Sequence, residues 1–116
     1  MIALALAAAA LTGQAELAKA LEGRVAGAPQ RCITLTRVIG TRVVPGAGLI
    51  FDAGNTLYLN RTRNPRRLRS NDIPAYRVFG GQLCRGEPVH RLDRSTGAQY
   101  GFAILGDFVP YRRAPR

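Results

Sequence analysis

Apolar residues in the middle of the chain fall in three short runs, and turn-forming residues separate them. The runs are Val43–Val44, Leu49–Phe51 and Leu57–Leu59, and the breaks are Pro45–Gly48 and Ala53–Asn55. Glycine adopts positive φ without strain and asparagine does so at little cost, so both residue types favour tight turns. The pattern predicts a meander of antiparallel strands against which the other segments pack.

Other segments with alternating or β-branched residues predict further strands. Arg31–Val38 shows the pattern most clearly, because it contains neither Gly nor Pro. The remaining predicted strands are Tyr76–Cys84, Val89–Asp93, Gln99–Leu105 and Phe108–Tyr111.

Gly, Pro and small polar residues predict the irregular parts of the chain. Arg24–Pro29 is expected to be a linker, and Ser70–Pro74 is expected to be a turn. The tail, residues 112–116, is basic and contains proline, so we expect it to fray.

Glu16–Glu22, with the sequence ELAKALE, predicts a short helix that ends at Gly23. Leu17, Ala20 and Leu21 share one face of this helix and are expected to lie on the sheet. Together with the turn spacing, this predicts one mainly β domain over residues 16–116. Its expected form is a small antiparallel barrel or two-layer sandwich of about five to seven strands with a short N-terminal helix.

Residues 1–15 resemble a secretory signal peptide. The segment Met1–Leu11 is uncharged and almost wholly apolar, and the small residues Gly13 and Ala15 precede a predicted cleavage site. The apolar run is too short for a transmembrane span, which takes about 20 residues. No Lys or Arg precedes the run, which leaves a buried N-terminal helix or a membrane anchor as alternatives. A signal peptide places the mature chain in the periplasm or outside the cell.

Cys32 and Cys84 are the two cysteines, and each falls in a predicted strand. Two cysteines in an exported chain more often form a disulfide than remain as thiols. Such a bridge closes a loop of about 50 residues and stabilises the fold by roughly 4 kcal/mol on the chain-entropy model. The alternative is a reactive thiol, but neither a CxxC motif nor an adjacent histidine supports it.

Several short motifs occur in order along the chain: Arg31–Ile33, Arg42–Val44, Tyr58, Asn60–Arg61, Leu83–Cys84 and Leu105–Phe108. In this order they resemble a family of small exported proteobacterial proteins. That family carries only a domain-of-unknown-function label and has no established activity, so the resemblance implies a compartment and a fold but no reaction. The family often has two more cysteines, and their joint absence here implies that they pair with each other and that the remaining two form the second bridge.

The net charge is the unusual property of the composition. The chain has 17 Lys and Arg against 7 Asp and Glu, which gives +10 at neutral pH and a pI near 11.2. All the basic residues except Lys19 are arginine, whose planar fork of donors suits carboxylate, phosphate and sulfate. A GC-rich genome produces the same arginine bias without selection for binding. The positive field still favours polyanionic partners.

One run of nine residues, RTRNPRRLR, concentrates five of the arginines. One interpretation is that this run binds anions. The alternative is that it is a solvated basic loop around the Asn64–Pro65 turn without a binding function. Asp72 follows the run and is expected to form at most a weak surface pair with a nearby arginine. The candidate anion-binding residues are Arg61, Arg63, Arg66, Arg67 and Arg69.

The sequence shows no catalytic or metal-binding constellation. His90 is the single histidine, which excludes a His/Cys zinc set, and its place in a predicted strand indicates a structural residue. Neither a nucleophile elbow nor a phosphate-binding glycine loop is present. The carboxylates next to turns are scattered along the chain. We therefore expect a protein without enzymatic activity, cofactor or metal.

The expected function is that of a non-catalytic envelope protein that binds an anionic envelope component or an acidic protein through its basic face. One alternative is a periplasmic inhibitor of an acidic hydrolase. Another is a cytosolic nucleic-acid binder, if the N-terminus is not a signal. Against nucleic acid, the chain has only four Tyr and four Phe, and none lies in the arginine run to stack on bases. The sequence carries no indication of the oligomeric state.

Overall fold

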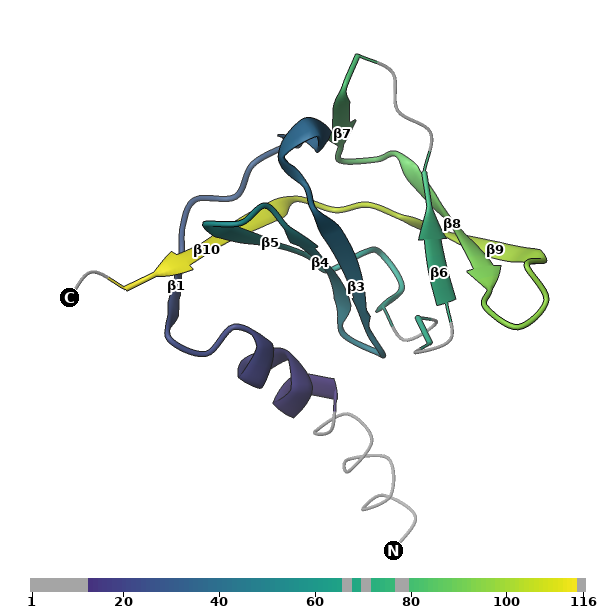
Figure 1. Cartoon of the computed structure of the whole chain (residues 1–116), viewed down its shortest axis with the longest axis horizontal. Coiled ribbons are helices and arrows are strands. Elements are labelled where there is room, and N and C mark those ends of the chain that lie inside the picture. The colour runs from purple at the N-terminus through teal and green to yellow at the C-terminus, as the bar shows by residue number, and fades with distance from the viewer. Residues whose placement is uncertain (1–12, 66–67, 70–71, 77–79, 115–116) are drawn as a thin grey trace, which may run out of the picture.

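The computed structural model describes residues 13–65, 68–69, 72–76 and 80–114. These residues form a mainly β fold of ten antiparallel strands with a short helix near the N-terminus (Figure 1). A single-turn 3₁₀ helix, η1, covers Leu35–Arg37. The strands are β1 (Arg24–Ala26), β2 (Cys32–Thr34), β3 (Gly40–Val44), β4 (Gly48–Asp52), β5 (Thr56–Asn60), β6 (Asp72–Ala75), β7 (Gln82–Cys84), β8 (Pro88–Asp93), β9 (Gln99–Ile104) and β10 (Phe108–Arg113).

The strands belong to three sheets. The largest has the order β1-β10-β5-β4-β3, a second contains β2 and β7, and a third has the order β6-β8-β9. Within the described residues no sheet closes into a barrel, so the layered form of the predicted fold fits. The number of strands exceeds the expected five to seven because several strands have only three residues.

The predicted meander is confirmed as β3–β4–β5. The strands pair antiparallel, with Val44 opposite Gly48 at the first turn and Asp52 opposite Leu57 near the second. Gly48 has to be glycine because a Cβ atom there would lie 2.5 Å from the main-chain oxygen of Asn60. The meander therefore depends on a close approach of backbones as well as on turn chemistry.

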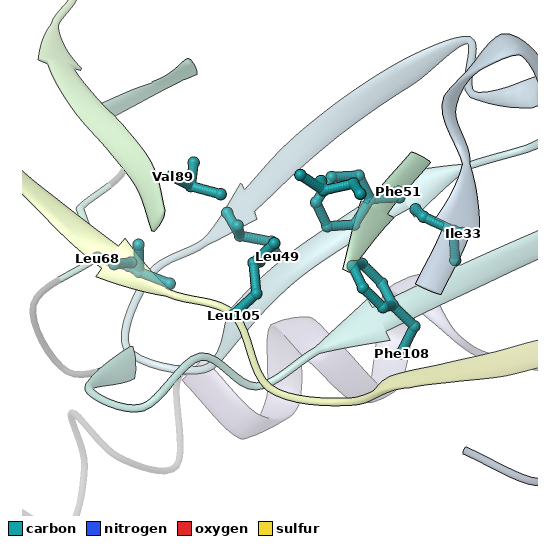
Figure 2. Packing of buried hydrophobic residues seen from close by; sticks show 9 residues of the cluster. Ile33, Leu49, Phe51, Leu68, Val89, Leu105 and Phe108 are labelled. Atoms are coloured by element: carbon teal, nitrogen blue, oxygen red, sulfur yellow. The ribbon is translucent and has the colours of Figure 1, made fainter. Parts of the chain in front are cut away.

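Strand β4 contributes to two hydrophobic cores, one on each face of the large sheet. Leu49 and Phe51 point to one side, and Ile50 points to the other, as the two-residue period of a strand requires. Phe51 is fully buried and meets the ring of Phe108 edge-on, with ring centroids 5.5 Å apart (Figure 2). Strand β4 is thus covered on both faces.

The first core joins the large sheet to the two smaller sheets. Apolar side chains from the β2–β7 pair, from β8 and β9, and from the segment before β6 meet the large sheet there (Figure 2). Its members are Ile33, Leu49, Phe51, Leu68, Leu83, Val89, Ala103, Leu105 and Phe108.

The second core joins the N-terminal helix to the opposite face of the large sheet. The helix includes residues 13–20, and Leu17 and Leu21 are buried against Val44 and Ile50. The predicted apolar face is confirmed, but the predicted bounds of the helix are not: it ends at residue 20, and Leu21 lies in the turn that follows. Residues 1–12 of the predicted signal lie outside the described residues, and no helix within the described ranges is long and apolar enough to cross a membrane.

The predicted disulfide between Cys32 and Cys84 is confirmed. The two residues lie directly opposite each other in the β2–β7 pair, with 4.0 Å between their Cα atoms. The bridge joins residues 52 positions apart in the sequence. It therefore fastens an early strand to a late one within the β2–β7 pair.

Two predicted strands are shorter than expected. The strand predicted over Arg31–Val38 ends at Thr34, because the chain then turns through η1 to enter a different sheet. The hydrogen bond from Val38 N to Leu35 O, 3.0 Å long, closes this turn. In the strand predicted over Tyr76–Cys84, residues 77–79 lie outside the described residues, and the strand found covers Gln82–Cys84.

Three segments predicted to be irregular form strands instead. The expected linker contains β1, which pairs with the part of β10 that was expected to fray, and Arg24 Nη1 also donates to Tyr111 O at 3.2 Å. β1 is the edge strand of the large sheet, and among the described strands its one partner is β10. The pairing therefore stabilises both segments. The turn predicted before Tyr76 is wrong from Asp72 onward, where β6 pairs with β8.

Candidate functional site: an arginine–aromatic cleft beside strand β9

The hairpin of β8 and β9 contains an irregularity that changes the direction of one side chain. Arg91 lies opposite Gly101, but Leu92 lies opposite Gln99, so Tyr100 is the extra residue of a β-bulge. A bulge re-aims the side chain of the inserted residue. Here the Tyr100 ring lies over the Arg91 guanidinium, with 4.8 Å between the guanidinium carbon and the ring centroid.

Arg91 is held in a slot on the inner face of this hairpin. Its residue exposure is only 8%, and a Cβ atom on Gly101 would lie 2.6 Å from Arg91 Nη2. The side chain therefore passes directly over Gly101 and beneath Tyr100. Glycine at position 101 leaves the space that the guanidinium occupies.

Asp72 supplies the opposite charge for this slot. Its side chain is 1% exposed, and Oδ2 lies 3.9 Å from Arg91 Nη1. The same oxygen accepts a hydrogen bond from the main-chain N–H of Arg69, 2.8 Å long. The sequence-based expectation of a surface pair is wrong, because β6 carries Asp72 into the interior. Removing one partner of such a buried pair costs several kcal/mol.

The structure brings part of the arginine run to the same place. Arg69 is exposed, and its guanidinium carbon lies 6.0 Å from the centroid of the Tyr100 ring. Arg63 is exposed as well, and its main-chain N–H donates to Ile104 O at 3.0 Å, which ties it to β9. Arg61, two residues before Arg63, is exposed and does not line the same cavity. The other two candidates, Arg66 and Arg67, lie outside the described residues.

A cleft of about 320 Å³ lies beside β9, and we call it the β9 cleft. Its walls are Arg63–Asn64, Leu68, Arg91 and residues 100–104 of β9. Tyr100 and Phe102 are 41% and 59% exposed, which is high for large aromatic side chains. Among the described residues, no carboxylate lines this cleft. Guanidinium groups next to accessible aromatic rings can hold an anion and contact an apolar part of the same ligand.

Two other cavities have weaker claims as anion sites, because a carboxylate lines each of them. A cavity of about 310 Å³ between the helix and the large sheet includes Asp52, and its Arg42 already pairs with Glu16 at 3.0 Å. A cavity of about 230 Å³ includes Asp72 together with Arg42 and Arg94. The β9 cleft is therefore the best supported site.

Catalytic chemistry finds no support in the described residues. They contain no group of three His, Cys, Asp or Glu side chains placed to hold a metal ion. His90 lies half-buried on β8, and its Nδ1 accepts a hydrogen bond from Gln99 Nε2, 2.7 Å long. The imidazole thus links the two strands of the hairpin. The site can bind through charge, hydrogen bonds and ring contacts.

Sequence reasoning missed Arg91, Tyr100 and Phe102 as site residues. The alternation of Tyr100, Phe102 and Ile104 correctly predicted a strand, but the buried position in that strand is Ala103. The only signal in the sequence was the presence of aromatic residues next to Gly101, where a bulge or a close approach is common. Comparison of the chain with models of protein families, with curated proteins and with solved structures finds no match.

Proposed function

We propose that this chain is a non-catalytic exported domain that binds an anionic ligand or partner through the β9 cleft. One observation carries the proposal. The exposed Tyr100 ring lies within 4.8 Å of the Arg91 guanidinium and within 6.0 Å of the Arg69 guanidinium, at the wall of a cleft that Arg63 also lines.

The arginines at the β9 cleft differ in burial, and this difference supports anion binding there. Arg91 is buried and paired with Asp72, so it fixes the Tyr100 ring and adds little free charge. Arg63 and Arg69 are exposed, and their guanidinium groups are accessible to carboxylate, phosphate or sulfate. The cleft thus combines a fixed aromatic wall with two accessible cations.

Export is the second part of the proposal. A disulfide such as Cys32–Cys84 persists in oxidising compartments and is rare in the cytosol of mesophiles. The apolar segment before residue 13 and the resemblance to a family of exported proteins support the same compartment, periplasmic or secreted. The net charge of +10 suits an anionic envelope component or an acidic protein there, including an acidic hydrolase.

Nucleic acid is a second candidate ligand on a specific observation. Phe102 is 59% exposed and lines the same cleft as Arg63, which supplies the aromatic platform that the arginine run itself lacks. Bases stack on such platforms with little sequence preference. This candidate requires a cytosolic or nucleic-acid-rich setting, so the disulfide ranks it below the exported binder.

The test compares two double variants of equal net charge. Arg63→Gln with Arg69→Gln alters the cleft, and Arg112→Gln with Arg113→Gln alters the exposed end of β10 at the opposite side of the molecule (Figure 1). Binding of a short fluorescent heparin oligosaccharide is measured by anisotropy over a series of salt concentrations. The cleft variant should lose at least about tenfold in affinity, since one charge-assisted hydrogen bond contributes roughly 1.5–3 kcal/mol.

The control variant should lose much less, and its dependence on salt should stay close to that of the parent. Equal losses in the two variants would show that diffuse net charge accounts for binding, and the proposal would be wrong. A labelled oligothymidine measured in parallel tests the second candidate. Tighter binding of that probe than of heparin, weakened by Phe102→Ala, would favour nucleic acid.

A further inference from the structure

The third sheet has an open edge along the β9 cleft. Its order is β6-β8-β9, so among the described strands β9 has a partner on one side only. Leu105 N donates to Glu87 O at 3.0 Å, and Gly86 N donates to Leu105 O at 2.9 Å, so the backbone groups of Leu105 face the segment that leads into β8. Backbone direction alternates along an antiparallel strand, so those of Ile104 and Phe102 face away from β8.

One hydrogen bond within the chain shows that the backbone carbonyl of Ile104 faces away from β8. Ile104 O accepts a hydrogen bond from Arg63 N at 3.0 Å, so the segment after β5 pairs with the first outward carbonyl. Within the described residues no strand continues this pairing toward Phe102 and Tyr100. The β9 cleft runs along that stretch and is lined by residues 100–104 of β9.

An open edge of this kind recognises extended polypeptide. Main-chain hydrogen bonds to the edge strand supply affinity, and the side chains of alternate residues supply selectivity. Residues two apart on an added strand lie about 6.7 Å apart on one face. A segment with acidic residues at alternate positions would place successive carboxylates near Arg63, in the wall of the cleft, and near Arg69, which lies beside Tyr100.

Charge decides which polypeptide the edge fits. A second copy of this chain would bring together two molecules of +10 each, and their repulsion opposes edge-to-edge pairing. An acidic segment matches both the net charge and the exposed arginines of the cleft. The bulge at Tyr100 limits the open stretch to a few residues, which further disfavours extensive self-association.

We propose that β9 binds an extended acidic polypeptide segment as a fourth strand of the β6-β8-β9 sheet. This inference rests on the proposed function and narrows its ligand from any anion to an acidic protein segment. Phe102 donates and accepts the central pair of main-chain hydrogen bonds. Arg63 and Arg69 pair with the carboxylates of the segment.

The test uses a blocked hexapeptide of alternating valine and glutamate and two N-methylated forms of it. In one form every valine nitrogen is methylated, and in the other every glutamate nitrogen is methylated, so each form blocks the amides of one edge and keeps the charge. Strand addition uses a single edge of the peptide. One methylated form should therefore bind at least about tenfold more weakly than the parent peptide, and the other should stay within about threefold.

Hydrogen exchange gives an independent measurement on the protein. The Phe102 N–H should exchange at least about tenfold more slowly with the parent peptide bound, because strand addition places this amide in a new hydrogen bond. Equal effects of the two methylations, or an unchanged Phe102 N–H, would overturn strand addition. If the peptide fails to bind while Arg63→Gln with Arg69→Gln still weakens heparin binding, the inference is wrong and the proposed function stands. If that double variant weakens the binding of neither probe, the inference and the proposed function are both wrong.

Discussion

Strands β4 and β9 are both rich in apolar residues, but the fold uses them in opposite ways. β4 has a partner strand on each side and buries its side chains on both faces, with Phe51 fully inaccessible. β9 has a partner on one side and exposes Tyr100 and Phe102 beside two exposed arginines. Residues that stabilise the fold and residues available for binding are thus separated. The exposed aromatic pair identifies the region of the molecule where a ligand gains most from contact.

Matched substitutions of two phenylalanines would test this difference most directly. Phe51→Ala should lower the free energy of unfolding by about 3–5 kcal/mol, because it leaves a cavity where Phe108 and Tyr76 contact the ring. Phe102→Ala should change it by less than about 0.5 kcal/mol, since the side chain is 59% exposed. Urea unfolding followed by circular dichroism measures both values. Similar losses in the two variants would show that β9 is a structural strand like β4.

The disulfide gives the next largest expected effect. Replacing Cys32 and Cys84 together by serine should lower stability by about 4 kcal/mol, because the bridge restricts a long loop in the unfolded chain. Thermal unfolding of the parent in a reducing agent should then coincide with unfolding of the double variant. Binding at the β9 cleft should persist at temperatures where the variant is folded. If the folded double variant lost binding, the β2–β7 pair would be shown to shape the cleft.

Features fixed by local chemistry could be predicted from the sequence. The meander follows from three apolar runs separated by turn residues, and the helix face follows from helical spacing. Both depend on residues that are neighbours in the chain. The disulfide was predictable because two cysteines leave one possible pairing within the chain.

Features that depend on contacts between distant segments could not be predicted. Asp72 and Arg91 meet only because β6 pairs with β8, and β1 forms only because β10 supplies its partner. Asn60 is similar: buried at the end of β5, it exchanges two hydrogen bonds of 2.9 Å with the backbone of Gly106, far along the chain. Of the candidate arginines, the structure places Arg63 in the wall of the cleft and Arg69 beside its Tyr100 ring, and no sequence pattern separated them from Arg61.

Two glycines in strands provide the finest test of how the cleft is built. A Cβ atom at position 101 would meet the Arg91 guanidinium, with Nη2 at 2.6 Å and Nε at 3.3 Å. The arginine cannot easily yield, because Asp72 holds it on one side and the Tyr100 ring covers it on the other. Gly40, in β3, has open space around it and needs no special backbone conformation. The two positions therefore differ in packing and not in secondary structure.

Gly101→Ala should lower the free energy of unfolding by roughly 1–3 kcal/mol through overpacking, and Gly40→Ala should leave it unchanged or raise it slightly. Because the added methyl group displaces Arg91, the Tyr100 ring resonances should shift in nuclear magnetic resonance spectra of Gly101→Ala. The same variant should weaken binding at the β9 cleft, whereas Gly40→Ala should not. A Gly101→Ala protein with parental stability and an unshifted Tyr100 ring would show that Arg91 moves aside at no cost. The buried arginine would then have no part in fixing the aromatic wall of the cleft.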